Sequence, residues 1–338
     1  MATDQLEDGS DEPDEFDDSD KTEAADEFDD ADEFEFDYDD AGFAPGHRAC
    51  SGCGPAIVAR HVVDEAGENT IVVNPTGCME VVSSPFPESA WGVSWIHNVF
   101  ANAPGVASGV EAAYRSFSRR GREEFEDHED VNFIVFAGDG ATFDIGMRSL
   151  SGMFERGHDV LYVCYDNEAY MNTGVQRSGS TPPGAHTTTT PSGEYSTGED
   201  APKKDMPAIA AAHGVEYVAT ASISDPIDFR KKVSRGLEVD GPAYVQVLSP
   251  CPVGWGFDGS ETIEMGELAV ETGVYPIYEM EHGEVTSAKT VRDRKPVEAY
   301  LERQDRFSHL FGGDAGEETI EAIQAEIDAQ AEDLGIDG

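Results

Sequence analysis

The feature that most constrains this chain is a series of short, almost wholly apolar runs separated by segments with helical patterning. NFIVFAG at 132–138 and DVLYVCYD at 159–166 are examples. Strands with one solvated face alternate apolar and polar residues, whereas strands covered on both faces of a parallel sheet are continuously apolar. The pattern therefore predicts an α/β fold with a mostly parallel sheet and helices on both faces. Strands are expected at 70–74, 132–138, 159–166, 217–222 and 243–249, and helices at 54–67, 104–121, 146–157, 205–214 and onward from Asp225.

Composition divides the chain into three regions. Residues 1–42 repeat a DEFDD-like unit, and such dense like charge predicts a disordered acidic tail. Residues 43–255 contain all the expected strands and are predicted to form one α/β domain. Residues 256–338 are expected to be an extension that contacts a neighbouring subunit and ends in an amphipathic helix near 316–333. The Gly-, Thr-, Ser- and Pro-rich stretch 168–203 is predicted to be a functional or mobile loop.

The chain is strongly acidic throughout. Its 338 residues include 69 Asp and Glu against 22 Lys and Arg, a formal net charge of −47. Residues 1–42 account for −20, which leaves −27 on the rest. Binding to nucleic acid or to an anionic membrane surface requires a basic face, so neither partner is expected. Acidity of this extent is expected for a protein from a high-salt cell, where salt screens the self-repulsion, although it is also compatible with an ordinary acidic protein.

Other sequence features favour a cytoplasmic protein. No apolar run approaches the roughly 18 residues needed for a membrane span. The acidic N-terminal stretch does not resemble a secretory signal or a transit peptide. Five cysteines in a chain of this length do not indicate a disulfide scaffold.

Four of the five cysteines are candidates for one site. Cys50 and Cys53 form a C-x-x-C pair, and Cys78 and Cys251 each follow a predicted strand. The ends of parallel strands meet at one edge of the sheet, so these thiols can converge there. The spacing alone leaves an iron–sulfur cluster, a zinc site, a redox pair or unrelated thiols open. Cys164 lies inside a predicted strand and is excluded as a core residue.

A second candidate site follows two other predicted strands. Gly138, Asp139 and Gly140 stand between a strand and a helix, where free backbone N–H groups can bind a diphosphate. Asp139 offers a carboxylate to Mg²⁺, which prefers oxygen ligands. Asn167 comes 28 residues later, after the next strand, and is therefore expected beside Asp139. This combination indicates a site for thiamine diphosphate and Mg²⁺.

Together the two constellations resemble the β subunit of 2-oxoacid:ferredoxin oxidoreductases of the pyruvate type. The similarity covers most of 43–255, and the acidic tail is no part of it. The matching stretches are HRACSGCG (47–54), NPTGCME (74–80), WIHNVFANAPGVASG (95–109), GDGATFDIG (138–146), YDNEAYMNTGVQRSGSTP (165–182), KKDMPAIAAAHG (203–214), YVATAS (217–222) and SPCPVGW (249–255).

The resemblance implies roles for individual residues of the 43–255 domain. A [4Fe–4S] cluster is expected on Cys50, Cys53, Cys78 and Cys251, and Mg²⁺ on Asp139, Asn167 and the carbonyl group of Ala169. The thiamine diphosphate is expected to be lined by Thr76, Gly77, Met79, His97, Asn98, Gly138, Gly140 and Asn172, together with Asp139 and Asn167. His97 and Asn172 are the catalytic candidates; a structural hydrogen bond for His97 and a turn role for Asn172 are the alternatives. Some family members carry Thr at the position of Asn167, which keeps an oxygen ligand.

The resemblance also implies an activity. It is the CoA-dependent oxidative decarboxylation of pyruvate to acetyl-CoA and CO₂, with electrons passing through one [4Fe–4S] cluster to ferredoxin. An α subunit is expected to supply the domain that covers the pyrimidine and the activating Glu, so that the active site lies between the subunits. The alternatives are 2-oxoglutarate or a branched 2-oxoacid as the substrate, a non-oxidative thiamine enzyme, and a non-catalytic iron–sulfur electron-transfer subunit.

Overall fold

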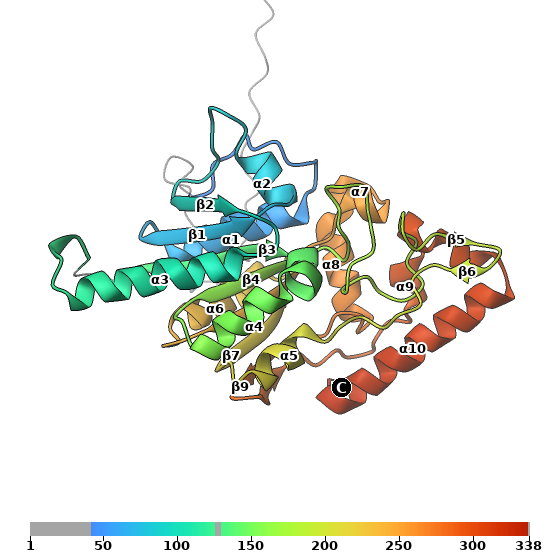
Figure 1. Ribbon diagram of the computed structural model, residues 1–338. Coiled ribbons are helices and arrows are strands. Elements are labelled where there is room, and N and C mark those ends of the chain that lie inside the picture. The colour runs from blue at the N-terminus through green and yellow to red at the C-terminus, as the bar shows by residue number, and fades with distance from the viewer. Residues whose placement is uncertain (1–41, 126–129, 337–338) are drawn as a thin grey trace, which may run out of the picture. The chain divides into compact units, whose positions relative to one another are not determined.

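The computed structural model describes residues 42–125 and 130–336, in which an eight-stranded sheet is the main element (Figure 1). Its order is β10-β9-β7-β8-β4-β3-β1-β2. The six strands from β7 to β2 are parallel, and β9 and β10 are antiparallel. The strands are β1 (Thr70–Pro75), β2 (Ser94–Asn98), β3 (Asn132–Gly138), β4 (Leu161–Asp166), β7 (Tyr217–Ser222), β8 (Ala243–Leu248), β9 (Tyr278–Glu281) and β10 (Glu284–Ala288), with β5 (Ser192–Gly193) and β6 (Ser196–Thr197) in a separate ribbon. The predicted acidic tail lies outside the described residues, apart from Gly42.

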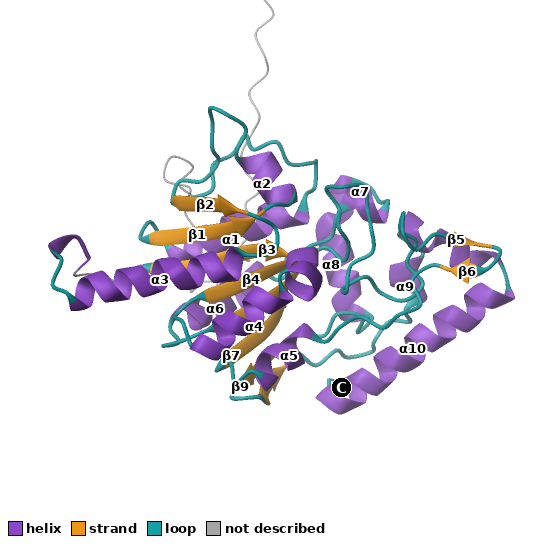
Figure 2. Cartoon of the chain, viewed as in Figure 1, coloured by secondary structure: helices purple, strands orange, loops and turns teal. Residues whose placement is uncertain are grey.

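Helices cover both faces of the sheet (Figure 2). One apolar cluster joins the sheet to α1 and α6, and a second joins the opposite face to α3, α4 and α5. The fold class predicted from the apolar runs is therefore confirmed. The α-helices are α1 (Gly54–Ala66), α2 (Cys78–Ser83), α3 (Ala103–Arg119), α4 (Met147–Arg156), α5 (Met206–Ala212), α6 (Pro226–Leu237), α7 (Pro252–Trp255), α8 (Thr262–Glu271), α9 (Glu298–Leu301) and α10 (Asp314–Leu334).

Local sequence explains the burial of the inner strands and the starts of two helices. Every residue of β1, β4, β7 and β8 is buried, in keeping with their mainly apolar composition. Asp205 and Asp225 cap α5 and α6, because their side chains accept hydrogen bonds from the backbone N–H groups of Ala208 and Asp228. A proline follows within the first turn of both helices, where its missing N–H group costs nothing.

The strand β2 is an addition that the sequence pattern does not predict. It lies at one edge of the sheet and pairs with β1 so that His97 is opposite Asn74 and Asn98 is opposite Pro75. None of its residues is buried, so it lacks the continuous apolar composition of the inner strands. Its position brings His97 and Asn98 to the end of β1.

The residues after 255, expected as an extension, belong to the same packed structure. β9 pairs with β7 in the main sheet, and α8, α9 and α10 form a third apolar cluster with Trp255 and Leu248. The helix expected near 316–333 is present as α10, which buries Ile320 and Ile327. The expected contact of this region with another subunit stays a prediction. Among the described helices, none has the length and apolar character needed to cross a membrane.

Candidate cofactor site

A pocket lies at the carboxyl ends of β1, β3 and β4, where a parallel α/β sheet binds its ligands. It brings together most of the residues predicted to line the cofactor or to bind metal. Those that line it are Thr76, Gly77, Cys78, Gly138, Asp139, Gly140, Asn167, Ala169 and Asn172, and Phe100, Ala141, Tyr165, Tyr170, Met171 and Thr173 complete the lining.

His97, Asn98 and Met79 lie beside this pocket rather than on its wall. The Nε2 atom of His97 is 3.0 Å from the Thr76 hydroxyl group, and the Thr76 N–H group donates to the Asn98 carbonyl oxygen over 3.2 Å. Both polar atoms of the Asn98 amide are buried without a partner, which is costly unless a ligand or another chain pairs with them. The Met79 side chain is fully buried in the apolar core.

The two glycines of the 138–140 turn allow aromatic rings to approach the backbone closely. A Cβ atom on Gly140 would stand 2.5 Å from Cε1 of Tyr170, and one on Gly138 would stand 2.9 Å from Cε2 of Tyr165. The chain continues as a π-helical segment, Gly140–Ile145, before α4. Such segments are rare in proteins overall, and those that occur are often found at functional sites.

Asp139, Asn167 and Ala169 present polar atoms to one point. One terminal atom of the Asn167 amide lies 3.0 Å from Asp139 Oδ1 and 3.0 Å from the Ala169 carbonyl oxygen. If this atom is the amide nitrogen, it donates a hydrogen bond to each of the two oxygens. If it is the amide oxygen, the three oxygens form a cluster in which both of these distances are 3.0 Å. Adjacent oxygens around an octahedral Mg²⁺ ion are about 3.0 Å apart, because Mg–O distances are about 2.1 Å. The spacing therefore fits the predicted ligand set.

Asp139 is almost completely buried, with the Ser178 hydroxyl group donating to Oδ2. Burial, with the Asp166 carboxylate nearby, raises the pKa of Asp139 well above its usual range. A cation on its other oxygen would favour the ionised form and oppose that effect. The chemistry of this carboxylate thus also fits a Mg²⁺ ligand.

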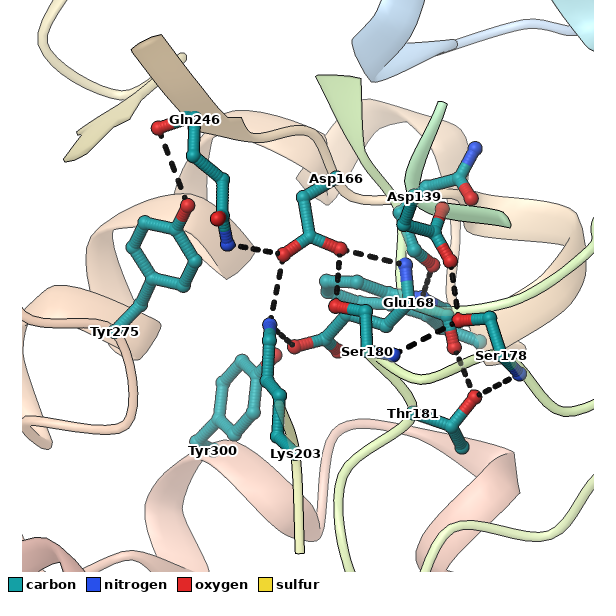
Figure 3. A network of polar contacts seen from close by, with 12 residues as sticks. Asp139, Asp166, Glu168, Ser178, Ser180, Thr181, Lys203, Gln246, Tyr275 and Tyr300 are labelled. Carbon is teal, nitrogen blue, oxygen red and sulfur yellow. Dashed lines mark hydrogen bonds and ion pairs between the residues drawn. The ribbon is translucent and has the colours of Figure 1, made fainter. Parts of the chain in front are cut away.

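The residues on either side of Asn167 form a buried ionic network (Figure 3). Asp166 accepts hydrogen bonds from Lys203 Nζ at 2.8 Å, Ser180 Oγ at 2.6 Å and Gln246 Nε2 at 2.8 Å. Burial raises the pKa of Asp166, and Lys203 opposes that shift. Burial alone would lower the pKa of Lys203, but its two carboxylate partners, Asp166 and Glu168, raise it above its usual range.

Glu168 is the second buried carboxylate of this network, and its backbone is strained. Its carboxylate contacts Lys203 Nζ at 3.1 Å and Arg306 Nη2 at 2.7 Å. Burial opposes ionisation of Glu168, but the two cations outweigh it and lower its pKa. Its φ angle of 67° is in the left-handed region, which costs a non-glycine residue on the order of 1 kcal/mol and is often retained at functional sites.

Contacts between two turns bring the predicted cluster cysteines near one another. The Gly54 N–H group donates to the Pro250 carbonyl oxygen at 3.2 Å, which packs the C-x-x-C turn against the turn of Cys251. Burial, with the thiols of Cys251 and Cys50 nearby, raises the pKa of Cys53 to about 12. Burial and the same neighbourhood of thiols likewise raise the pKa of Cys78 to about 12, and the nearby Asn172 side chain opposes this shift.

The cysteine groups do not meet in metal-ligand geometry as they stand. Within 42–125 and 130–336, no three Cys, His, Asp or Glu side chains are arranged to hold a metal ion. Cys50 is exposed and the other three candidate cysteines are half-buried, whereas Cys164 is buried in β4. Four thiols within electrostatic reach of one another fit a cluster-binding set in composition. Their role as ligands stays a prediction.

The sequence did not predict the two cations, Lys203 and Arg306, that pair with the carboxylates on either side of Asn167. Lys203 lies in a stretch that carries the family resemblance, yet nothing local indicates that its ammonium group is buried. Arg306 is 138 positions from Glu168 and belongs to the region expected to be an extension. Charge and spacing hold no signal for either contact, because only tertiary packing brings them to the carboxylates.

The fold and pocket define a class of enzyme domain that binds thiamine diphosphate. Residues 75–247 match the family described as thiamine pyrophosphate enzyme, C-terminal TPP binding domain. The matched range begins at the end of β1 and ends in β8, so it contains the pocket and every charged residue of the buried network except Arg306.

Curated relatives define the family more closely. Pyruvate synthase subunit PorB of Methanocaldococcus jannaschii is 54% identical over 294 residues, which is 87% of this chain and 96% of the relative. PorB of Pyrococcus furiosus is 45% identical and covers 87% of this chain and 94% of its own. The chain belongs to the family of pyruvate synthase subunit PorB, which confirms the resemblance to a 2-oxoacid:ferredoxin oxidoreductase β subunit.

More distant relatives extend this picture. Ketoisovalerate oxidoreductase subunit VorB of Pyrococcus horikoshii is 40% identical, covering 83% of this chain and 88% of its own. A 2-oxoglutarate:ferredoxin oxidoreductase from Magnetococcus marinus, solved with 2-oxoglutarate, coenzyme A and succinyl-CoA bound, has a TM-score of 0.51 and 24% identity. It covers 62% of this chain and 66% of that one, and the likeness concerns the fold.

Proposed function

We propose that this chain is the β subunit of an enzyme that oxidatively decarboxylates pyruvate and transfers the acetyl group to coenzyme A. One observation carries the proposal: Cys78 lines the pocket and also lies within electrostatic reach of Cys50, Cys53 and Cys251. A redox group held by these thiols would adjoin the thiamine. Non-oxidative thiamine chemistry needs no such neighbour.

The chain's own residues would bind and orient the cofactor. Thiamine diphosphate supplies a nucleophilic carbon and an electron sink for loss of CO₂. Asp139, Asn167 and the Ala169 carbonyl group would hold Mg²⁺ against the diphosphate, and the glycine turn at 138–140 would let it approach the backbone. Thr76 and His97 would orient groups at the end of β1 through their mutual hydrogen bond.

Asn172 is placed for a role between the two centres. It lines the pocket together with Cys78, and its side chain opposes the rise in the pKa of the Cys78 thiol. We assign Asn172 and His97 to the catalytic groups, because Asn172 lines the cofactor pocket and His97 lies beside it, within hydrogen-bond distance of Thr76 on its wall. Hydrogen bonds to cysteine sulfur also tune the reduction potential of iron–sulfur clusters.

The proposal includes partners. An α subunit would cover the pocket and bring the Glu that activates the thiamine, and ferredoxin would accept the electrons one at a time. The unpaired, buried amide of Asn98 beside the pocket supports a further binding partner there. The name of the PorB relatives supports pyruvate, whereas the VorB relative leaves a branched 2-oxoacid as the alternative.

The complex purified without oxygen tests the proposal. We expect it to contain thiamine diphosphate, Mg²⁺, iron and sulfide, to absorb at about 400 nm, and to reduce ferredoxin in a reaction that depends on both pyruvate and CoA. Cys251→Ser should remove most of the absorption assigned to this subunit's cluster, whereas Cys164→Ser is the matched control. A complex that contains a cluster but no thiamine would replace this proposal with electron transfer alone.

Assays with pyruvate, 2-oxoglutarate and 2-oxoisovalerate decide the substrate. We expect the largest kcat/KM for pyruvate. An equal or larger value for either competitor would overturn this part of the proposal and leave the cofactor assignment intact.

We also propose that the chain is adapted to high salt. The support is its net charge of −47, of which −27 belongs to residues 43–338. The melting temperature should rise from low salt to molar KCl, because the Debye length falls from about 10 Å at 0.1 M to about 3 Å at 1 M. Equal melting temperatures in both would refute the adaptation.

A further inference from the structure

A segment far along the chain reaches the underside of the cofactor site. Arg306 lies in the helical segment Asp305–Gly312, and its side chain is only 4% exposed. Its Nη2 atom is 2.7 Å from Glu168 Oε2, and its Nε donates to Gln304 Oε1 over 2.8 Å. Its guanidinium lies 3.9 Å above the centre of the Trp255 ring. The cation therefore contacts a carboxylate, an amide oxygen and an aromatic ring.

Trp255 connects Arg306 to both candidate centres. Its indole Nε1 donates to the Asn167 carbonyl oxygen at 2.8 Å, and its backbone N–H donates to the Cys251 carbonyl oxygen at 2.9 Å. The ring is fully buried. Arg306 thus touches the turn of Asn167 through Glu168 and the turn of Cys251 through Trp255.

Asp166 and Glu168 are matched by an equal number of cations only when Arg306 is included. Asp166 and Glu168 are both buried, and Lys203 is shared between them. With Arg306 there are two cations for two carboxylates. Without it, Glu168 would share one ammonium group with Asp166, and its Oε2 atom would lose the partner that Arg306 provides.

We propose that Arg306 is a positioning residue for the cofactor site. By pairing with Glu168 and stacking on Trp255, it holds the turn 167–169 in the conformation that turns the Asn167 amide and the Ala169 carbonyl group toward Asp139. It also ties that turn to the turn carrying Cys251. The C-terminal region therefore sets metal affinity without touching the metal. This inference rests on the proposed Mg²⁺ and thiamine diphosphate site.

Binding of Mn²⁺ in place of Mg²⁺, followed by its EPR signal in the whole complex with thiamine diphosphate, is the test. In Arg306→Met we expect half-saturation at about tenfold higher Mn²⁺, the lower end of the range for loss of a direct partner of a metal ligand, because Arg306 acts through both Glu168 and Trp255. Arg306→Lys should recover part of the loss, because it keeps the charge but not the planar stacking group.

Two further variants make the result decisive. Arg303→Met is the matched control: Arg303 lies three residues away and pairs with Glu261 and Glu264 outside the site, so its Mn²⁺ half-saturation should equal wild type. Trp255→Phe keeps an aromatic ring but removes the N–H group on the Asn167 carbonyl, and should weaken Mn²⁺ binding about threefold to tenfold. This variant carries the test if Arg306→Met does not fold.

Each outcome has one meaning. Wild-type Mn²⁺ affinity in folded Arg306→Met, or in Trp255→Phe if that is the variant that folds, overturns the positioning role. Equal losses in Arg306→Met and Arg303→Met also overturn it, because they would indicate a general effect of charge. Failure of the wild-type complex to bind Mn²⁺ with thiamine diphosphate would instead refute the proposed function on which this inference rests.

Discussion

Arg303 and Arg306 stand three residues apart, and each contacts carboxylate groups, but they lie in opposite environments. Arg303 is 34% exposed and its partners Glu261 and Glu264 are also at the surface. Arg306 and its partner Glu168 are 4% and 2% exposed. Exposed pairs are screened by water and salt, whereas a buried pair is strongly missed when one partner is removed. Both arginines pair with carboxylates, so the degree of burial, and not the number of ion pairs, decides how much each pair contributes to stability.

The same contrast separates the two regions of the molecule to which these residues belong. The surface around α8 and α9 has ion pairs such as Lys295–Glu271, in which both side chains are about half exposed. The region beneath the pocket has Asp139, Asp166 and Glu168, all buried. Three buried carboxylates are gathered here, and such clustering of buried ionisable groups is common at functional sites.

The largest expected effect is the loss of the shared cation. Lys203→Met leaves two buried carboxylates with Arg306 alone, and we expect the free energy of unfolding to fall by about 3–5 kcal/mol. Chemical denaturation of the complex measures it. Lys204→Met is the control, because Lys204 is 41% exposed and pairs with the partly exposed Asp144. Similar losses in both variants would erase the distinction between the two regions.

Asp139→Asn should affect function without a comparable loss of stability. The variant removes a carboxylate that burial disfavours, so without Mg²⁺ the melting temperature should be unchanged or higher. The Mg²⁺-dependent activity should fall on the order of 100-fold or more, because even outer partners of a metal ligand contribute 10- to 100-fold. A variant that retains activity would show that Asp139 is structural.

A half-buried titratable group, His61, lies on α1, outside the network. Burial, then the Arg230 charge, lowers the pKa of His61, against the attraction of Asp64. The unfolded chain therefore binds the proton more readily. The stability that neutral His61 contributes is present above about pH 6.5 and is lost as the pH falls through its lowered pKa.

His61→Gln should make the melting temperature less sensitive to acid, by at most about 2 °C between pH 7.5 and pH 5. Thermal melts of the variant and of wild type at both values measure it. A variant with a steeper acid dependence than wild type would contradict the assigned sign.

The smallest effect is expected for the surface pair. Arg303→Met should change the melting temperature slightly at low salt and not measurably in molar KCl, because its carboxylate partners are solvated. The loss in Lys203→Met should persist in molar KCl. Melts of the two variants at both salt concentrations therefore compare the two regions directly.

Much of the fold and the site is predictable from local sequence. Runs such as 132–138 and 243–249 are buried strands, which continuous apolar composition over a short length, rich in β-branched and aromatic residues, predicts. Once the strands are parallel, the residues after them must meet at one edge, which brings Asp139 and Asn167 together. The edge strand β2 escaped prediction because an unburied strand leaves little apolar signal.

The sequence by itself determined the parallel sheet, the turn of Gly138 to Gly140 and the gathering of chemistry after strands, because these depend on short-range pattern and chain order. Only the tertiary structure decided that Lys203 and Arg306 lie beneath the site and that residues after 255 complete the sheet. The physical reason is that the same residue type can be buried or exposed, as Arg306 and Arg303 are, and the local sequence does not distinguish the two. Their difference exists only once distant segments have packed around them.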